Sequence, residues 1–263
     1  MKNILKEIIA NKRFEVDIQK QSISLEQLQN GLTDRKPHRS MRMALAESSS
    51  GIIAEFKRRS PSKGWIKENA EIDKIISAYT QAGASALSIL TDEKFFGGSL
   101  RDILIARTLT DIPILRKDFV IDEYQLYQAK IAGADVVLLI AAVLERGKCE
   151  ALAGMAHELG LEVLLEIHNS SELSYIIPDI DMVGINNRNL KTFHTDVDTS
   201  FQLVEQLPQS VLLVSESGIS NPETVKKLRT AGYRGFLIGE TFMKTENPGD
   251  TLKDFITQLN SLQ

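Results

Sequence analysis

The sequence predicts a (βα)8 TIM barrel preceded by an N-terminal helical extension. From residue 52 onward, short apolar runs alternate with amphipathic segments, and this order of strand and helix recurs eight times. A glycine stands between several helical segments and the following strand, where a helix ends in left-handed geometry. The run from Val136 to Ile140 is apolar at every position, as expected of a parallel strand that is buried on both faces.

Residues 1–50 are predicted to form the extension and residues 51–263 the catalytic barrel, within a single domain overall. The first nine residues have apolar side chains at helical spacing, the segment from Ser22 to Glu26 offers a serine N-cap, and residues 39–46 suit a short basic helix. A segment of about 50 residues is too short to fold alone. We therefore expect it to pack onto the barrel rim.

The predicted strands are short and apolar, and most are separated by segments long enough for a helix. They comprise residues 52–56, 86–90, 114–115, 136–141, 161–167, 182–186, 211–215 and 235–239. The clearest helical segments have apolar stripes wide enough to cover a sheet, and they comprise residues 72–82, 122–132, 151–159, 222–231 and 252–262.

The glycines at the predicted helix ends are Gly83, Gly133, Gly160 and Gly232. Their regular placement indicates repeated strand–helix units. A doubly wound open sheet is the alternative architecture, but such a sheet normally has a glycine-rich dinucleotide turn after its first strand. The segment from Glu55 to Arg59 is charged and has no glycine, which favours the barrel.

Composition limits the function classes. The chain has 263 residues, 43% hydrophobic and 25% charged, which is ordinary for a globular protein. A net charge of −4 without a basic arm argues against a nucleic-acid partner, although a locally basic pocket remains open. No run approaches the roughly 18 apolar residues of a membrane span, and Cys149 alone excludes an internal disulfide. We expect a cytoplasmic monomer with no membrane partner, in which Cys149 is incidental.

Side chains that exchange protons stand at the ends of successive predicted strands. Lys117 follows residues 114–115, Glu55 and Lys57 end the first strand, and Glu166 and Glu216 end two later ones. Because the carboxyl ends of barrel strands and the loops after them build the active site, we expect these groups to converge. Their neighbourhood supplies the remaining candidates, which are Ser60, Phe96, Phe119, Asn186, Arg188, Ser217, Gly218 and Glu240.

The types of residue indicate acid–base chemistry on a phosphorylated substrate. Two lysines can protonate an oxygen or pair with a carboxylate, and Glu55 and Glu166 can accept protons. Small residues follow the last two strands, at 215–219 and at 238–240, and Gly218 and Gly239 leave their backbone N–H groups open to a phosphate dianion.

No metal or cofactor is expected. The four histidines, His38, His157, His168 and His194, have no paired ligand spacing. His168 lies two residues beyond Glu166 and is expected to be a rim residue rather than a catalyst.

Five segments resemble those of the indole-3-glycerol phosphate synthase family. In chain order they are EFKRRSPSKG (55–64), FGGS (96–99), LRKDF (115–119), GINNRNL (184–190) and SESGI (215–219). The resemblance spans essentially the whole chain. It implies a cofactor-free step of tryptophan biosynthesis, in which 1-(2-carboxyphenylamino)-1-deoxyribulose 5-phosphate closes to indole-3-glycerol phosphate with loss of CO₂ and water. Because the chain ends at Gln263, we expect none of the isomerase domain that is fused to some members.

The resemblance also implies roles. Lys117 is the general acid at the substrate carbonyl, Glu166 is the general base, Lys57 holds the carboxylate, and Glu55 orients the lysines. Which lysine protonates the leaving hydroxyl stays open. The remaining implied roles are a polar wall of Asn186 and Arg188, aromatic contacts from Phe96 and Phe119, and phosphate contacts from Ser60, Ser217 and Gly239.

Other readings remain at this stage. The basic segment from Lys57 to Lys63 could be a solvated loop, Glu166 could be a structural ion-pair partner of Lys117, and Glu240 could cap a helix. Another phosphate-binding barrel enzyme, such as a sugar-phosphate isomerase or an aldolase, is the alternative function. A non-catalytic phosphometabolite-binding protein is the third, although binding alone does not require two lysines and two glutamates at one barrel mouth.

Overall fold

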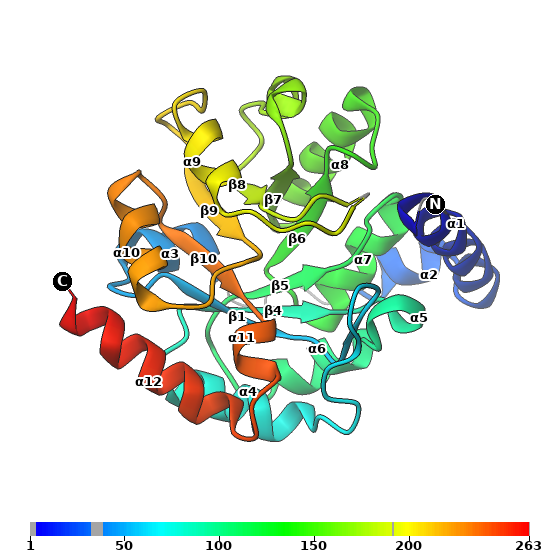
Figure 1. The fold of residues 1–263 in the computed structure, drawn as a ribbon. Coiled ribbons are helices and arrows are strands. Elements are labelled where there is room, and N and C mark those ends of the chain that lie inside the picture. Colours follow the sequence, from blue (N-terminus) through cyan, green and yellow to red (C-terminus); the bar gives the residue numbers. More distant parts are fainter. Residues whose placement is uncertain (1–3, 33–38, 191, 263) are drawn as a thin grey trace.

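The computed structural model describes residues 4–32, 39–190 and 192–262. Eight parallel strands close into a barrel in the order β1-β10-β9-β8-β7-β6-β5-β4 (Figure 1). Their bounds are β1 (Ile52–Phe56), β4 (Ala86–Leu90), β5 (Ile114–Lys117), β6 (Val136–Ile140), β7 (Glu162–Ile167), β8 (Met182–Asn186), β9 (Leu212–Glu216) and β10 (Gly235–Ile238). The (βα)8 prediction is confirmed.

Helices surround the barrel, and each covers the outward apolar face of the strands beside it (Figure 1). Those of the outer ring are α4 (Ile72–Gln81), α6 (Leu100–Arg107), α7 (Glu123–Ala132), α8 (Arg146–Glu158), α9 (Asp198–Val204), α10 (Pro222–Thr230) and α12 (Pro248–Ser261). The four glycines predicted at helix ends all have positive φ, from +65° at Gly160 to +114° at Gly232. The predicted helix terminations are therefore confirmed.

The strand–helix alternation is interrupted after β7. A 3-10 helix, η1 (Ser170–Tyr175), replaces the α-helix that the repeat predicts between β7 and β8. Asn169 caps it by accepting a hydrogen bond from the Ser171 N–H, and Pro178 follows soon after. Small polar residues that bond to their own backbone favour such a turn over a regular helix.

Two short strands and two short helices lie in the loops at the barrel mouth. They are the antiparallel hairpin β2 (Arg59–Ser60) and β3 (Gly64–Trp65), with α5 (Glu93–Phe96) and α11 (Glu240–Met243). The helix α8 begins five residues before the predicted 151, and Cys149 is a buried residue of this helix. Among the helices of the described ranges, none is long and apolar enough to cross a membrane.

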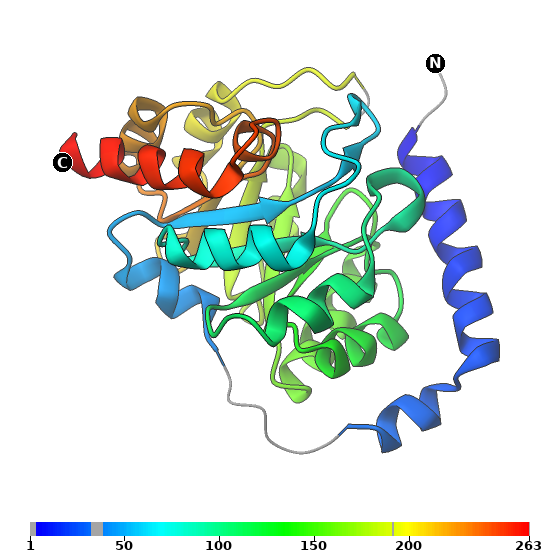
Figure 2. The same cartoon turned by 90° about the horizontal axis from the view of Figure 1, so that it is seen from below.

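The extension meets the barrel at both ends. Met41 and Leu45 of α3 (Met41–Glu47) are fully buried with the inward side chains of the strands, so α3 fills the barrel floor and does more than cover a rim. Figure 2 shows α3 where the strands begin and α1 (Ile4–Ser22) on the side where they end. The next helix, α2 (Leu25–Asn30), has the predicted serine N-cap at Ser24.

Candidate active site

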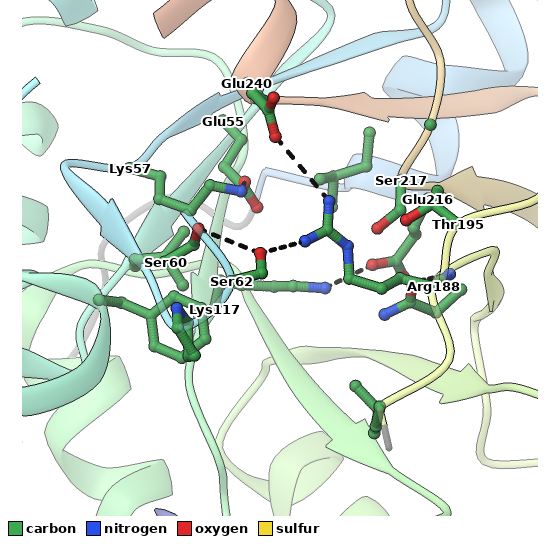
Figure 3. Close-up of a pocket in the computed structure, with 18 of the residues that line it drawn as sticks. Glu55, Lys57, Ser60, Ser62, Lys117, Arg188, Thr195, Glu216, Ser217 and Glu240 are labelled. Carbon is green, nitrogen blue, oxygen red and sulfur yellow. Dashed lines mark hydrogen bonds and ion pairs between the residues drawn. The ribbon is translucent and has the colours of Figure 1, made fainter. Parts of the chain in front are cut away.

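All fourteen site residues predicted from the sequence line one cavity of about 570 Å³ at the carboxyl ends of the strands. Ten residues of its lining are labelled in Figure 3. A volume of this size suits a small organic substrate. The predicted members are Glu55, Lys57, Ser60, Phe96, Lys117, Phe119, Glu166, Asn186, Arg188, Glu216, Ser217, Gly218, Gly239 and Glu240. The structure thus brings them together, while their chemical roles stay predictions.

Lys117 lies between two buried glutamates at the bottom of the cavity. Its Nζ is 2.9 Å from Oε2 of Glu166 and also contacts Oε2 of Glu216. Asn186 donates a hydrogen bond of 3.0 Å to the other oxygen of Glu166. The three charged groups come from β5, β7 and β9, so barrel closure rather than sequence proximity assembles them.

The cluster keeps its lysine charged. Burial acts to lower the pKa of Lys117, but Glu166 and Glu216 outweigh it and hold that pKa above the usual lysine range. Burial acts to raise the pKa of Glu166, yet Lys117 and His168 bring it below its usual range. Burial raises the pKa of Glu216, and the negative charge of Glu166 adds to the effect. The cluster is therefore a Lys117 ammonium beside an ionised Glu166, and Glu216 is the carboxyl that is protonated more easily.

A second pair stands across the mouth. Lys57 Nζ is 2.5 Å from Oε1 of Glu55. The absence of a side chain at Gly239 leaves room for that carboxylate, because a Cβ there would lie 2.4 Å from the same oxygen. Packing against Glu55 therefore requires a glycine at position 239, in addition to the phosphate contact that the sequence predicts there.

Arg188 ties two mouth loops together. Its Nη1 donates to Ser62 Oγ at 2.5 Å, and its Nη2 is 3.8 Å from Oε2 of Glu240 (Figure 3). Ser62 lies in turn 3.5 Å from the Oγ of Ser60. Arg188 therefore links the loops after β1, β8 and β10, and Glu240, the first residue of α11, pairs with it.

The loop after β9 has strained backbone. Ser217 has φ +68°, which is uncommon for a residue with a side chain, and Gly218 follows at φ +80°. The side-chain amide of Asn187 holds this turn by donating to the Ser217 carbonyl at 3.1 Å. Successive backbone N–H groups in a turn can form a concavity that binds anions.

The apolar wall includes residues that the sequence did not reveal. The rings of Phe96 and Phe119 are 6.0 Å apart between centroids. Ile4, Leu5 and Ile8 of α1 also line the cavity. Their helical apolar spacing was visible, but nothing local indicated that this face covers the barrel mouth.

Lys12 of α1 is a further missed residue. Its side chain is fully buried, and its Nζ is 2.9 Å from Asp118 Oδ1 and 3.0 Å from Asp92 Oδ2. Arg116 completes the cluster at 2.9 Å from the other oxygen of Asp118. These charges flank Lys117 and Phe119 and connect α1 to the mouth.

The rim prediction for His168 is wrong. Its side chain is 10% exposed and lies behind Glu166, with Nε2 3.2 Å from Glu166 Oε1. Among the described residues, no three His, Cys, Asp or Glu side chains are grouped as a metal site, and His38 lies outside those residues.

Comparisons with known proteins show the family to which the chain belongs. Residues 5–255 match the family described as "Indole-3-glycerol phosphate synthase". The chain is 71% identical, over 97% of its own length and 98% of the relative's, to the indole-3-glycerol phosphate synthase of Bacteroides thetaiotaomicron. A solved structure of thiamine phosphate pyrophosphorylase from Pyrococcus furiosus superposes with a TM-score of 0.62 at 15% identity, covering 85% of this chain and 99% of that one. The last likeness concerns the fold alone.

Proposed function

The chain belongs to the indole-3-glycerol phosphate synthase family, and we propose that its pocket carries out that family's reaction with Lys117 as the general acid and Glu166 as the general base. The reaction closes 1-(2-carboxyphenylamino)-1-deoxyribulose 5-phosphate to indole-3-glycerol phosphate with loss of CO₂ and water. The protein is accordingly a carboxy-lyase of tryptophan biosynthesis.

The position of the Lys117 ammonium carries this proposal. It is buried at the floor of the cavity and keeps its proton because Glu166 and Glu216 flank it. Ring closure requires an aromatic carbon to attack a ketone, and negative charge develops on the ketone oxygen. A preorganised ammonium in a water-poor site stabilises that charge and can transfer its proton.

The remaining steps use the same two carboxylate–lysine pairs. The ring carbon bearing the carboxylate forms the new bond to the ketone carbon, and Lys117 protonates the ketone oxygen to a hydroxyl. The carboxylate then leaves as CO₂, and its bonding electrons restore the aromatic ring. Finally the hydroxyl leaves as water, which takes one proton from an acid, either Lys57 or Lys117 after it has regained a proton from solvent, while Glu166 removes a proton from the adjacent carbon.

The lining suggests one orientation of the substrate. The phosphate would bind the backbone N–H groups of the loop after β9 and at Gly239, and the carboxylate would face Lys57. The aromatic ring would lie against Phe96 and Phe119, which contact each other at 6.0 Å between centroids and both line the cavity. Further substrate contacts are proposed for Glu55, Ser60, Asn186, Arg188, Glu216, Ser217, Gly218 and Glu240, all of which line the cavity.

A Schiff-base aldolase fits this pocket poorly. Such an enzyme needs a neutral lysine amine as nucleophile, whereas Lys117 is held as an ammonium by two carboxylates. Borohydride added with substrate should therefore trap no covalent adduct. Covalent trapping at Lys117 would favour the aldolase reading.

Turnover is the direct test. The purified protein should convert the ribulose phosphate to indole-3-glycerol phosphate without added metal or cofactor, followed by product fluorescence. Binding of substrate without turnover would indicate the non-catalytic alternative.

Inorganic phosphate tests the orientation. It should compete with substrate and protect the backbone amides of Ser217, Gly218 and Gly239 from hydrogen exchange. Gly218→Ala should raise KM more than it lowers kcat, because the added Cβ would lie 2.8 Å from Thr195 and disturb the anion loop. Gly239→Ala is a poorer probe, since it also displaces Glu55.

Residues 1–50 and 51–263 are proposed to act as one domain, and the protein as a cytoplasmic monomer. Residues of both segments line the cavity, including three from α1. The lone cysteine, Cys149, is a buried thiol, which is compatible with a reducing compartment. Sedimentation of the intact chain tests the oligomeric state.

A further inference from the structure

The short connection after β7 places His168 next to Glu166, the proposed general base, and places Glu172 next to His168. His168 is the first residue after β7 and lies two residues beyond Glu166, while Ile167 between them packs outward into the core. The 3-10 helix η1 then returns Glu172 to the histidine. The His168 backbone N–H donates to Glu172 Oε2 at 2.7 Å, which fixes the loop.

The imidazole is held between two carboxylates. His168 Nε2 is 3.2 Å from Glu166 Oε1, and His168 Nδ1 is 3.5 Å from Glu172 Oε2. These are ion-pair distances, and in the described part of the chain neither ring nitrogen has another partner. Their side chains are 4%, 10% and 13% exposed for Glu166, His168 and Glu172 respectively, so water competes little with either contact.

We propose that His168, anchored by Glu172, is a positioning residue that fixes the orientation and the negative charge of the general base Glu166. The inference rests on the function proposed above. His168 does not line the cavity, so it acts through Glu166 and not on the substrate.

The contacts of Glu166 show how the positioning works. Its Oε2 accepts a hydrogen bond from Lys117, and its Oε1 accepts one from the Asn186 amide and lies at ion-pair distance from His168 Nε2. Without His168, the carboxylate keeps only two partners and can rotate about its terminal bond. Misplacement of a catalytic group by about 1 Å costs about 100-fold in rate.

The charge of the imidazole follows from its surroundings. Burial acts to lower the pKa of His168, but Glu166 and Glu172 raise it to about 9. The other charged groups around Glu166 are Lys117 from β5 and, through that lysine, Glu216 from β9 and Glu55 from β1. Removing one of the two positive charges beside Glu166 therefore makes its protonation easier.

Two substitutions separate orientation from charge. His168→Gln places an amide donor where Nε2 faces Glu166, and His168→Asn places one only toward Glu172. We expect His168→Asn to lower kcat by about 10-fold or more with a change in KM below about 3-fold. His168→Gln should recover part of that loss.

The pH profile distinguishes positioning from mere support of the fold. In both variants the ratio of variant to wild-type kcat should fall as pH is lowered, because Glu166 then takes up a proton at a higher pH than in the wild type. Glu172→Gln should act in the same direction. A ratio that stays constant with pH, or equal kcat losses in the Gln and Asn variants, would overturn the proposal.

The chain offers a matched control in His157, which pairs with Asp181 at 2.9 Å away from the cavity. His157→Asn should leave kcat and its pH profile unchanged. A loss equal to that of His168→Asn would contradict a specific role.

Side-chain NMR of His168 in the intact protein supplies a readout that needs no turnover. The ring of His168 should remain protonated at neutral pH and titrate well above the usual histidine range, and less so in Glu172→Gln. Titration near 6.5 would overturn the inference even if the enzyme is active. An inactive wild type with the raised titration would instead contradict the proposed function alone.

Discussion

The protonation state of Lys117 depends on its neighbours and does not follow from its residue type alone. An isolated buried lysine would lose its proton, since burial disfavours the charged form. Here Glu166 and Glu216 reverse that preference and hold the residue as an ammonium, which is the form that the proposed general-acid role requires. The neighbouring carboxylates therefore determine the charge of the lysine.

Lys117→Met should lower kcat by roughly 100-fold or more with a much smaller change in KM, because a general acid acts mainly in the transition state. The variant should fold, with Glu166 and Glu216 sharing a proton in place of the ammonium. Steady-state kinetics and thermal denaturation measure both effects. Lys74→Met, which removes an exposed lysine from α4, is the matched control and should behave as wild type. Near wild-type turnover in Lys117→Met would refute the assignment.

Gly184 gives a second prediction at the scale of one residue. A Cβ at this position of β8 would lie 2.1 Å from Glu216 Oε1, so Gly184→Ala must push that carboxylate away from Lys117. We expect kcat to fall about 10-fold or more, with modest loss of stability. Gly154→Ala is the control, because nothing lies within 4 Å of a Cβ there. It should keep kcat and raise the free energy of unfolding by about 0.4–1 kcal/mol in mid-helix. Unchanged kinetics of Gly184→Ala would show that the Glu216 contact is dispensable.

At the scale of an element, β7 carries a buried glutamate at each end with a different partner. Glu162 at the start accepts hydrogen bonds from the backbone N–H groups of Met41 and Arg42, at 2.7 and 3.0 Å, and so caps α3 at the barrel floor. Glu166 at the end faces the cavity. The start of the strand thus contributes to the stability of the fold and its end contributes to the pocket, as expected of the two faces of a barrel.

Substitutions at the two ends of β7 should affect activity and stability separately. Glu166→Gln should fold normally and accumulate substrate or an intermediate in single-turnover experiments, because an amide cannot accept the proton. Glu162→Gln should keep activity per folded molecule and lose about 1–3 kcal/mol of stability, since a charge-assisted cap is weakened. Denaturant titration and single-turnover kinetics measure the pair. If Glu166→Gln mainly lowers stability and keeps its activity, Glu166 is structural.

The elements were predictable where local patterns determine them. Apolar runs and glycine helix ends gave the strand–helix order, and polar residues at strand ends gave the cavity, because a parallel barrel brings all those ends to one face. Two features needed the third dimension. Glu172 reaches His168 through a 3-10 helix that has no regular apolar period, and Lys12 meets Asp92 and Asp118 only after α1 docks.

For the whole molecule, the docking of α1 joins the extension to the site. Its apolar residues line the cavity, and its buried Lys12 bonds to two aspartates of the barrel loops. One of these, Asp118, stands directly between Lys117 and Phe119 in the sequence. Loss of the Lys12–Asp118 contact should therefore weaken substrate binding as well as lower stability.

Lys12→Met tests this coupling. Removing one partner of a buried ion pair typically costs about 3–5 kcal/mol, which should undock α1, expose it to limited proteolysis and raise KM. Lys20→Met is the matched control on the same helix, since Lys20 pairs with Asp122 at 2.8 Å at a half-exposed position and should cost at most about 1 kcal/mol.

The stability lost in Lys12→Met should depend on pH in a direction that follows from the pKa shifts of Asp118 and Lys12. Burial acts to raise the pKa of Asp118, but Lys12 and Arg116 lower it below its usual range. Its contribution is therefore present above the unfolded pKa of about 3.9 and is lost as pH falls through the lower folded pKa. Burial acts to lower the pKa of Lys12, yet Asp118 and Asp92 raise it, so the lysine's contribution persists until strongly basic pH. The melting-temperature difference between wild type and Lys12→Met should thus be constant from about pH 5 to 9 and shrink in acid. A difference that grows on acidification, or a Lys12→Met enzyme with wild-type KM and protease resistance, would show that α1 is held by its apolar face alone.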